Sequence, residues 1–133
     1  MTYALDTGTI IVLLNGDLAV TTKMEKAILA GNDFIIPPVA DYEIQRGLLY
    51  KPLSKRVEIY FALREYYGVG EMTAEMWVRA AQIYVDLRRK GFTVGDDDIF
   101  IAAFCLVNGY TLITRNTKDF VNITDLRSEN WID

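Results

Sequence analysis

Residues 3–14 read YALDTGTIIVLL, and this stretch predicts how the fold begins. The apolar positions 3–5 favour a buried strand that ends at Asp6, and the apolar positions 9–14 favour a helix after a sharp turn. In an open α/β sheet, ligands bind in the crevice beyond the carboxyl ends of parallel strands, and Asp6 would project into that crevice. Capping of the first helix is the alternative role for Asp6, because aspartate is a common N-cap residue.

The order of strand and helix recurs farther along the chain. We expect strands at 33–36 and 111–114, an edge strand within 126–132, and helices at 19–30 and 39–49. A helix capped by Ser54 would face inward with Val57, Tyr60 and Phe61. Another, starting at Thr73, would bury a stripe formed by Met76, Trp77, Ala80, Ala81, Tyr84 and Leu87. The helix after Gly95 is apolar on almost every face and is predicted to be buried. Repeated strand-helix units require right-handed crossovers, so we predict an α/β fold with helices on both faces of a mainly parallel sheet.

Length and composition exclude several classes of protein. The 133 residues, 51% hydrophobic, predict one domain over 1–133 with a continuous core. The chain has no histidine, so it has no imidazole base, and its one cysteine, Cys105, lies in an apolar run and is predicted to be core. No stretch is long and apolar enough to span a membrane, and the N-terminus lacks the basic region of a signal peptide, so we expect a cytoplasmic protein.

Acidic side chains stand near the predicted carboxyl ends of the strands, and therefore at one edge of the sheet: Asp6, Glu43, the run 96–98 and Asp119. Carboxylates gathered from distant segments repel one another, so a fold that collects them usually does so around a divalent metal. One aspartate of the run is expected to cap its helix, and periodicity does not select the functional one. Gly47, inside a helix where glycine costs about 1 kcal/mol relative to alanine, suggests a close approach to that face.

Four motifs of the chain occur together, in order, in one known family. They are LDT at 5–7, EIQRG at 43–47, GDDDIFIAA at 95–103 and LITRNTKDF at 112–120, followed by LRSENW at 126–131. This set resembles the motifs of PIN-domain ribonucleases, specifically the VapC-type toxins of prokaryotic toxin-antitoxin pairs. The resemblance runs from Leu5 to Trp131. It implies a three-layer PIN-like fold, Mg²⁺- or Mn²⁺-dependent endoribonuclease activity, a cognate antitoxin and a homodimer.

The resemblance also implies roles for particular residues. Asp6 and Asp98 match the main metal ligands, Glu43 matches the helix glutamate, and Asp119 is chosen over Asn116 as the fourth acid. Polar residues that would support these acids are Thr7, Thr114 and Asn116, and the arginines expected to contact RNA are Arg46 and Arg115. At Gly8 the chain departs from the family, in which asparagine or serine is usual.

The chemistry of such a site accounts for the acidic charge of the chain. Hard carboxylate oxygens suit Mg²⁺ or Mn²⁺, and a bound cation would lower the pKa of a water and let a chain of net charge −4 attract phosphate. Two alternatives stay open. A receiver-like signalling domain also gathers acids around Mg²⁺, although Asp6 stands without the expected neighbouring acid. A PIN-fold protein that binds RNA or antitoxin without cutting would be consistent with Gly8.

Overall fold

The computed structural model describes residues 1–132. Within them the chain forms four strands and seven helices: β1 (Thr2–Leu5), α1 (Thr7–Leu14), α2 (Leu18–Leu29), β2 (Asp33–Ile35), α3 (Pro38–Tyr50), α4 (Ser54–Tyr67), α5 (Ala74–Arg89), α6 (Asp96–Asn108), β3 (Thr111–Ile113), α7 (Thr117–Phe120) and β4 (Ser128–Glu129). None of the helices in this part of the chain has both the length and the apolar character needed to cross a bilayer.

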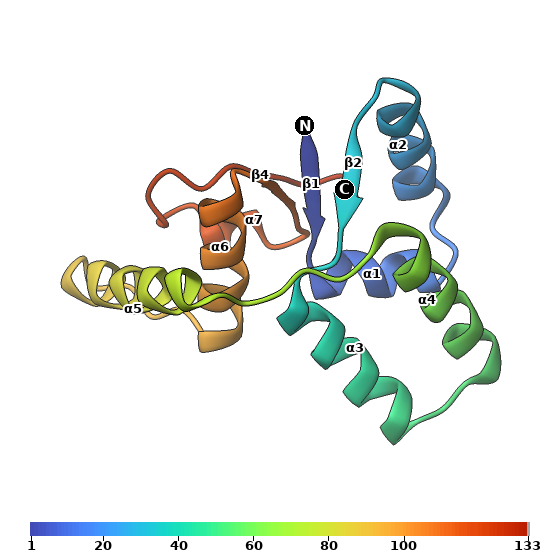
Figure 1. Cartoon of the computed structure of the whole chain (residues 1–133), viewed down its shortest axis with the longest axis horizontal. Helices are drawn as coiled ribbons and strands as arrows, with labels where there is room; N and C mark the ends of the chain where they lie inside the picture. Colours follow the sequence, from blue (N-terminus) through green and yellow to red (C-terminus); the bar gives the residue numbers. More distant parts are fainter. Residues whose placement is uncertain (133) are drawn as a thin grey trace.

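The strands form one sheet in the order β2-β1-β3-β4, and every neighbouring pair is parallel. Tyr3 of β1 is in register with Phe34 of β2 and with Thr111 of β3, so the three strands end at the same level. In Figure 1, α5, α6 and α7 lie on one side of β1, and α1 to α4 lie below it and on the other side. The predicted α/β class, with a short parallel sheet between helices, is confirmed.

Helix α6 lies at the centre of the hydrophobic core. Its residues Ile101, Ala102 and Ala103 are at most 1% exposed, and Cys105 is fully buried, as the apolar sequence predicted. Burial raises the pKa of the Cys105 thiol, which therefore stays protonated at neutral pH. Burial of apolar surface contributes about 25 cal/mol per Å², so α6 is a principal source of stability and a rigid support for residues at its N-terminus.

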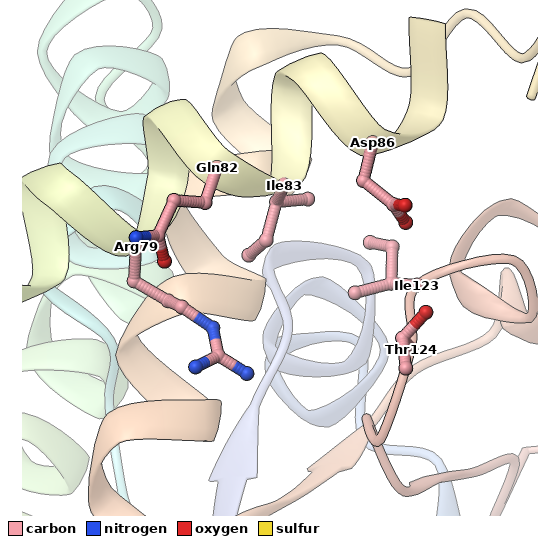
Figure 2. A pocket seen from close by; sticks show the side chains of 6 residues that line it. All are labelled: Arg79, Gln82, Ile83, Asp86, Ile123 and Thr124. Carbon is pink, nitrogen blue, oxygen red and sulfur yellow. The ribbon is translucent and has the colours of Figure 1, made fainter. Parts of the chain in front are cut away.

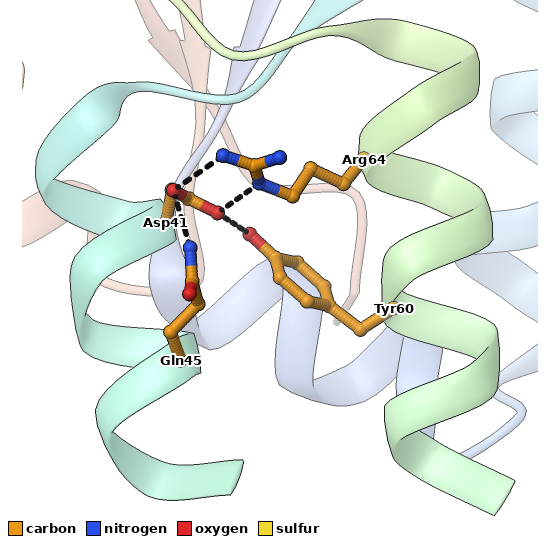
Figure 3. A network of polar contacts seen from close by, with 4 residues as sticks. All are labelled: Asp41, Gln45, Tyr60 and Arg64. Atoms are coloured by element: carbon orange, nitrogen blue, oxygen red, sulfur yellow. Dashed lines mark hydrogen bonds and ion pairs between the residues drawn. The ribbon is translucent and has the colours of Figure 1, made fainter. Parts of the chain in front are cut away.

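A buried carboxylate connects α3 to α4 (Figure 3). Asp41 Oδ1 accepts hydrogen bonds from Tyr60 Oη at 2.6 Å and Arg64 Nε at 2.9 Å, and its Oδ2 accepts one from Gln45 Nε2 at 2.8 Å. Tyr60 is the buried residue of α4, so this network fixes where α4 lies. Successive helical residues are about 100° apart, so Asp41 and Glu43 point to opposite sides of α3. One side of the helix therefore binds α4 while the other carries a predicted site residue.

Several local predictions were wrong. Leu53 is the N-cap of α4 and makes no side-chain capping bond within the described residues, while Ser54 is the first helical residue. Phe61 is 44% exposed, and on α5 Trp77 and Tyr84 are 47% and 42% exposed. The buried stripe of α5 contains Met76, Ala80, Ile83 and Leu87. The apolar residues of α5 cover two adjacent faces, about 100° apart, and periodicity alone did not show which one packs against α6.

Candidate functional site

Asp6 lies at the carboxyl end of β1, where β1 and β3 end side by side. Its backbone N–H continues the ladder to Ile113 O at 3.0 Å, and its side chain is 5% exposed. Asp6 Oδ1 accepts the N–H of Thr7 at 2.9 Å, and Oδ2 accepts the hydroxyl of Thr114 at 2.7 Å. Asp6 is therefore the N-cap of α1, the role that the sequence offered as an alternative to a site residue. It is also the most buried acid of the site.

Glu43 reaches the same place from α3. The hydroxyl of Thr7 donates to Glu43 Oε1 at 2.8 Å, and Arg46 Nη2 lies 3.9 Å from Oε2. The Arg46 side chain is 62% exposed and its guanidinium lies 5.2 Å from the centre of the Tyr42 ring. The predicted supporting residues Thr7 and Thr114 therefore do contact acids, each holding one carboxylate oxygen in place.

Three aspartates occupy the first turn of α6, where the positive end of the helix dipole stabilises negative charge. The N-cap is Gly95, and none of the three caps the helix with its side chain, contrary to expectation. Asp98 is half-buried, and burial together with nearby acidic charges, that of Asp6 among them, raises its pKa. Asp97 is exposed; burial raises the pKa of Glu43, and the charge of Asp97 adds to this effect.

Asp119 lies on α7, a one-turn helix that was not predicted from the sequence. The N-cap of α7 is Asn116, whose backbone N–H donates to the Thr114 hydroxyl at 3.0 Å. Asn116 therefore supports Thr114 through its backbone, and Thr114 in turn orients Asp6. Arg115 is exposed beside it, and its carbonyl accepts a bond from Asn130 at 3.5 Å.

The acids affect one another electrostatically. Burial raises the pKa of Asp98 to about 7, with further contributions from the charges of Asp97, Asp6, Asp119 and Glu43. Burial also raises the pKa of Asp6; hydrogen bonds from Thr114 and Thr7 oppose this effect, and the charges of Asp97 and Asp119 add to it. Acids from four separate segments are thus close enough to shift one another's pKa values.

The chemistry of this cluster fits a hard divalent cation. All of its donors are carboxylate or hydroxyl oxygens, which Mg²⁺ and Mn²⁺ prefer, and the chain contains no histidine to favour a softer metal. Among residues 1–132, no three Asp, Glu or Cys side chains are already arranged as a ready metal-binding group. Ionised carboxylates repel one another when they approach closely, and a bound cation would offset that repulsion.

A groove between α1, α3 and α4 opens beside Glu43. It has a volume of about 320 Å³ and is lined by Ile11, Leu14, Glu43, Ile44, Gly47, Leu48, Lys51, Leu53 and Arg56. No described atom lies within 4 Å of the position that a Cβ of Gly47 would occupy. Nothing within the described chain therefore approaches Gly47 as the sequence suggested, and its missing side chain widens the groove.

A second cavity, of about 230 Å³, lies between α5 and the segment after α7 (Figure 2). Its lining consists of Arg79, Gln82, Ile83, Asp86, Ile123 and Thr124, none of which is a predicted site residue. The acid cluster and this cavity are therefore separate features.

Gly8, the departure from the family pattern, lies in the first turn of α1 next to Thr7. Its φ angle is not positive, and a Cβ built there would meet no described atom within 4 Å. The backbone at this position therefore has room for a side chain.

Comparisons with known proteins agree with this geometry. Residues 3–126 match the PIN domain family. The chain is 24% identical to ribonuclease VapC2 of Rickettsia felis over 98% of both proteins, and 38% identical to the tRNA(fMet)-specific endonuclease VapC of Shigella flexneri over 50 residues, 38% of each. It also resembles the crystal structure of VapBC2 from Rickettsia felis bound to a promoter DNA fragment, with a TM-score of 0.91, 23% identity, and coverage of 98% of this chain and 99% of that one.

The resemblance that the sequence motifs indicated is confirmed at the level of family and fold. Because the family match covers 124 of the 133 residues, from position 3 to position 126, this protein belongs to the PIN domain family.

Proposed function

We propose that this protein is a Mg²⁺-dependent endoribonuclease and the toxin of a type II toxin-antitoxin pair, acting as a single domain in the cytoplasm. The observation that carries the proposal is the convergence of Asp6, Glu43, Asp98 and Asp119 at the carboxyl ends of β1 and β3. Membership of the PIN domain family sets aside the receiver-like alternative. Relatives named ribonuclease VapC over almost the full chain support the nuclease activity.

The residues of the site would have distinct roles in such a reaction. Asp6 and Asp98 would hold Mg²⁺ or Mn²⁺, and Asp6 is oriented for this by Thr7 and Thr114. When bound, the cation would supply an activated water and neutralise charge on the phosphate. Glu43 Oε1 is held by the Thr7 hydroxyl, and Oε2, which lies 3.9 Å from Arg46 Nη2, would take a proton from the attacking water. Asp119, on the exposed side, would orient that water.

Arg46 and Arg115 would contact RNA outside the acids. Both side chains are exposed: Arg46 stands one helical turn from Glu43, and Arg115 follows Thr114 directly. Phosphate contacts from such arginines position a nucleic acid without reading its sequence. The substrate itself is suggested by the relative from Shigella flexneri, which is named for tRNA(fMet).

The antitoxin partner would use the groove beside Glu43. The apolar lining from Ile11, Leu14 and Ile44 suits an amphipathic segment, and Glu43 at the side of the groove suits an arginine of that segment. A bidentate contact between that arginine and the carboxylates would compete with the cation for them and inhibit the nuclease. Solved VapBC complexes are among the structures that this fold resembles.

We also propose a homodimer. Helix α5 exposes Trp77, Val78, Tyr84 and Val85, each between 42% and 60%, along one side. Apolar patches of this kind often mark association sites. Light scattering of the purified protein would give its mass in solution.

Cleavage of a mixed tRNA pool tests the function directly. We expect defined fragments with Mg²⁺ and none with EDTA, and no fragments from Asp6→Asn, because its amide cannot replace the buried carboxylate. Binding of tRNA without cleavage under every divalent cation would favour the non-cleaving PIN-fold alternative. A protein that neither binds nor cleaves tRNA would contradict both possibilities.

A further inference from the structure

We propose that the ring of Tyr42 is a stacking site for an unpaired base of the RNA substrate, on the exposed face of α3 beside the acids. The inference rests on the proposed function, because the base belongs to the same RNA that the acids would cut. Tyr42 directly precedes Glu43 in the sequence. Neither the sequence motifs nor the family resemblance gives it a role.

Tyr42 lies on the side of α3 that faces water. Its side chain is 60% exposed, whereas Ala40, Asp41 and Ile44 of the same helix are buried. Single exposed apolar or aromatic residues are common on protein surfaces, so exposure alone does not indicate a binding site. The contacts of the ring are what distinguish Tyr42.

Arg46 joins the Tyr42 ring to the acid site. Its guanidinium lies over the ring, 5.2 Å from the ring centre, and its Nη2 is 3.9 Å from Glu43 Oε2. Residues three and four positions apart on a helix are neighbours, which allows both contacts at once. A similar pair occurs on α5, where Arg88 lies 5.1 Å from the centre of the Tyr84 ring, but Arg88 forms no ion pair within residues 1–132. The pair on α3 is therefore the one that adjoins the acids.

The charge of this face is complementary to a nucleic acid. The exposed residues of α3 and its C-cap are Tyr42, Arg46, Gly47, Leu49, Tyr50 and Lys51. They include two cations and no acid. Single-stranded RNA needs cations for its phosphates and flat surfaces for its bases, and unpaired bases stack on aromatic rings and on guanidinium planes. The face provides both kinds of group beside Glu43.

The position of the ring predicts what a stacked base does. Arg46 covers one face of the ring, which leaves the other face for a base. Because Arg46 also contacts Glu43, that base belongs to a nucleotide close to the phosphate at the acids. Stacking is equally strong before and during the reaction, so it should lower KM and leave kcat nearly unchanged. Every base has an aromatic face, so the contact positions a single strand without selecting a sequence.

RNA binding by ring variants tests this role. We would use the Asp98→Asn protein, which should not cut, and add Tyr42→Leu, Tyr42→Phe or the control Tyr50→Leu, since Tyr50 is 92% exposed on the same helix. Fluorescence anisotropy would measure binding of a short oligoadenylate and of an RNA duplex of equal length. We expect Tyr42→Leu to weaken oligoadenylate binding at least about fivefold, and Tyr42→Phe and Tyr50→Leu to change it less than about twofold. Duplex binding should not change, because its bases are not free to stack.

Steady-state cleavage of tRNA by the protein with an intact Asp98 gives a second measurement. Tyr42→Leu should raise KM by a similar factor with little change in kcat, and Tyr42→Phe should restore KM. Equal oligoadenylate binding with and without Tyr42→Leu, or equal losses from Tyr42→Leu and Tyr42→Phe, would overturn the inference while tRNA cleavage still supported the proposed function. So would a protein that cuts tRNA but does not bind oligoadenylate, or a Tyr42→Leu variant whose mass in light scattering shows that this face joins two copies of the chain. If the wild-type protein neither binds nor cuts RNA, the proposed function is overturned as well.

Discussion

Asp98→Asn should stabilise the metal-free protein, although it removes a predicted metal ligand. Burial and four neighbouring carboxylates raise the pKa of Asp98 from 3.8 to about 7. At about 1.4 kcal/mol per tenfold change in an acid constant, this corresponds to about 4 kcal/mol of unfavourable free energy in the ionised folded state. Because Asp98 is only half-buried, water screens much of this repulsion, and we expect a gain of about 1 to 2 kcal/mol.

The sign of the effect depends on pH. Between about pH 4 and pH 7 the folded protein keeps a proton on Asp98 that the unfolded chain has lost, so the wild-type free energy of unfolding falls as pH rises. The amide introduced by Asp98→Asn does not titrate, so the advantage of this variant should grow across the same window and level off above about pH 8. Below pH 4 both proteins carry an uncharged group at this position, and their stabilities should be similar.

Urea unfolding with EDTA at pH 4, 6 and 8 measures this difference, with Asp96→Asn as a control for loss of a charge from the same turn. Added Mg²⁺ should then stabilise the wild-type protein by mass action and stabilise Asp98→Asn much less. Equal stabilities of wild type and Asp98→Asn at pH 8 would refute the proposed repulsion. An advantage for Asp98→Asn that did not vary with pH would refute its assignment to the titration of Asp98.

Three further predictions concern other parts of the protein. Gly8→Asn should fold normally, because no described atom lies within 4 Å of a Cβ at this position. The variant should also lower the Mg²⁺ concentration for half-maximal cleavage by about tenfold. An unchanged Mg²⁺ titration would show that a side chain at this position is irrelevant. Burial alone would raise the pKa of Asp41, but hydrogen bonds from Arg64, Tyr60 and Gln45 outweigh burial, so the pKa is lowered. Asp41→Asn should therefore reduce the free energy of unfolding in urea by about 1 to 3 kcal/mol at pH 7 and by less below pH 4. A loss that did not vary with pH would contradict this prediction. Gly47→Met should weaken antitoxin binding at least about tenfold in calorimetry, because the new side chain enters the groove that Gly47 lines. The free variant should still cleave RNA. Unchanged binding would show that the antitoxin binds elsewhere.

The sequence predicted the main acids because their positions follow from the sheet. Asp6 and Asp119 follow inner strands, and Asp98 opens the helix that precedes β3, so parallel pairing alone brings their segments to one edge. The supporting role of Thr7 and Thr114 came from the family resemblance, and the structure supplies the two hydrogen bonds that it did not specify.

Other features depend on tertiary contacts that no local pattern encodes. Asp41 is an acid buried by partners 19 and 23 residues away, Tyr60 and Arg64, so its sequence neighbourhood gave no signal.

Single-turnover cleavage of tRNA by wild type, Asp98→Asn and Asp96→Asn, each with Mg²⁺ and with EDTA, tests the central claim most directly. The claim is that acids from four segments form one cation-dependent nuclease site. It predicts cleavage by wild type and Asp96→Asn with Mg²⁺ only, and for Asp98→Asn a rate no higher than that measured with EDTA. Wild-type rates from Asp98→Asn, or cleavage by the wild-type protein in EDTA, would contradict it.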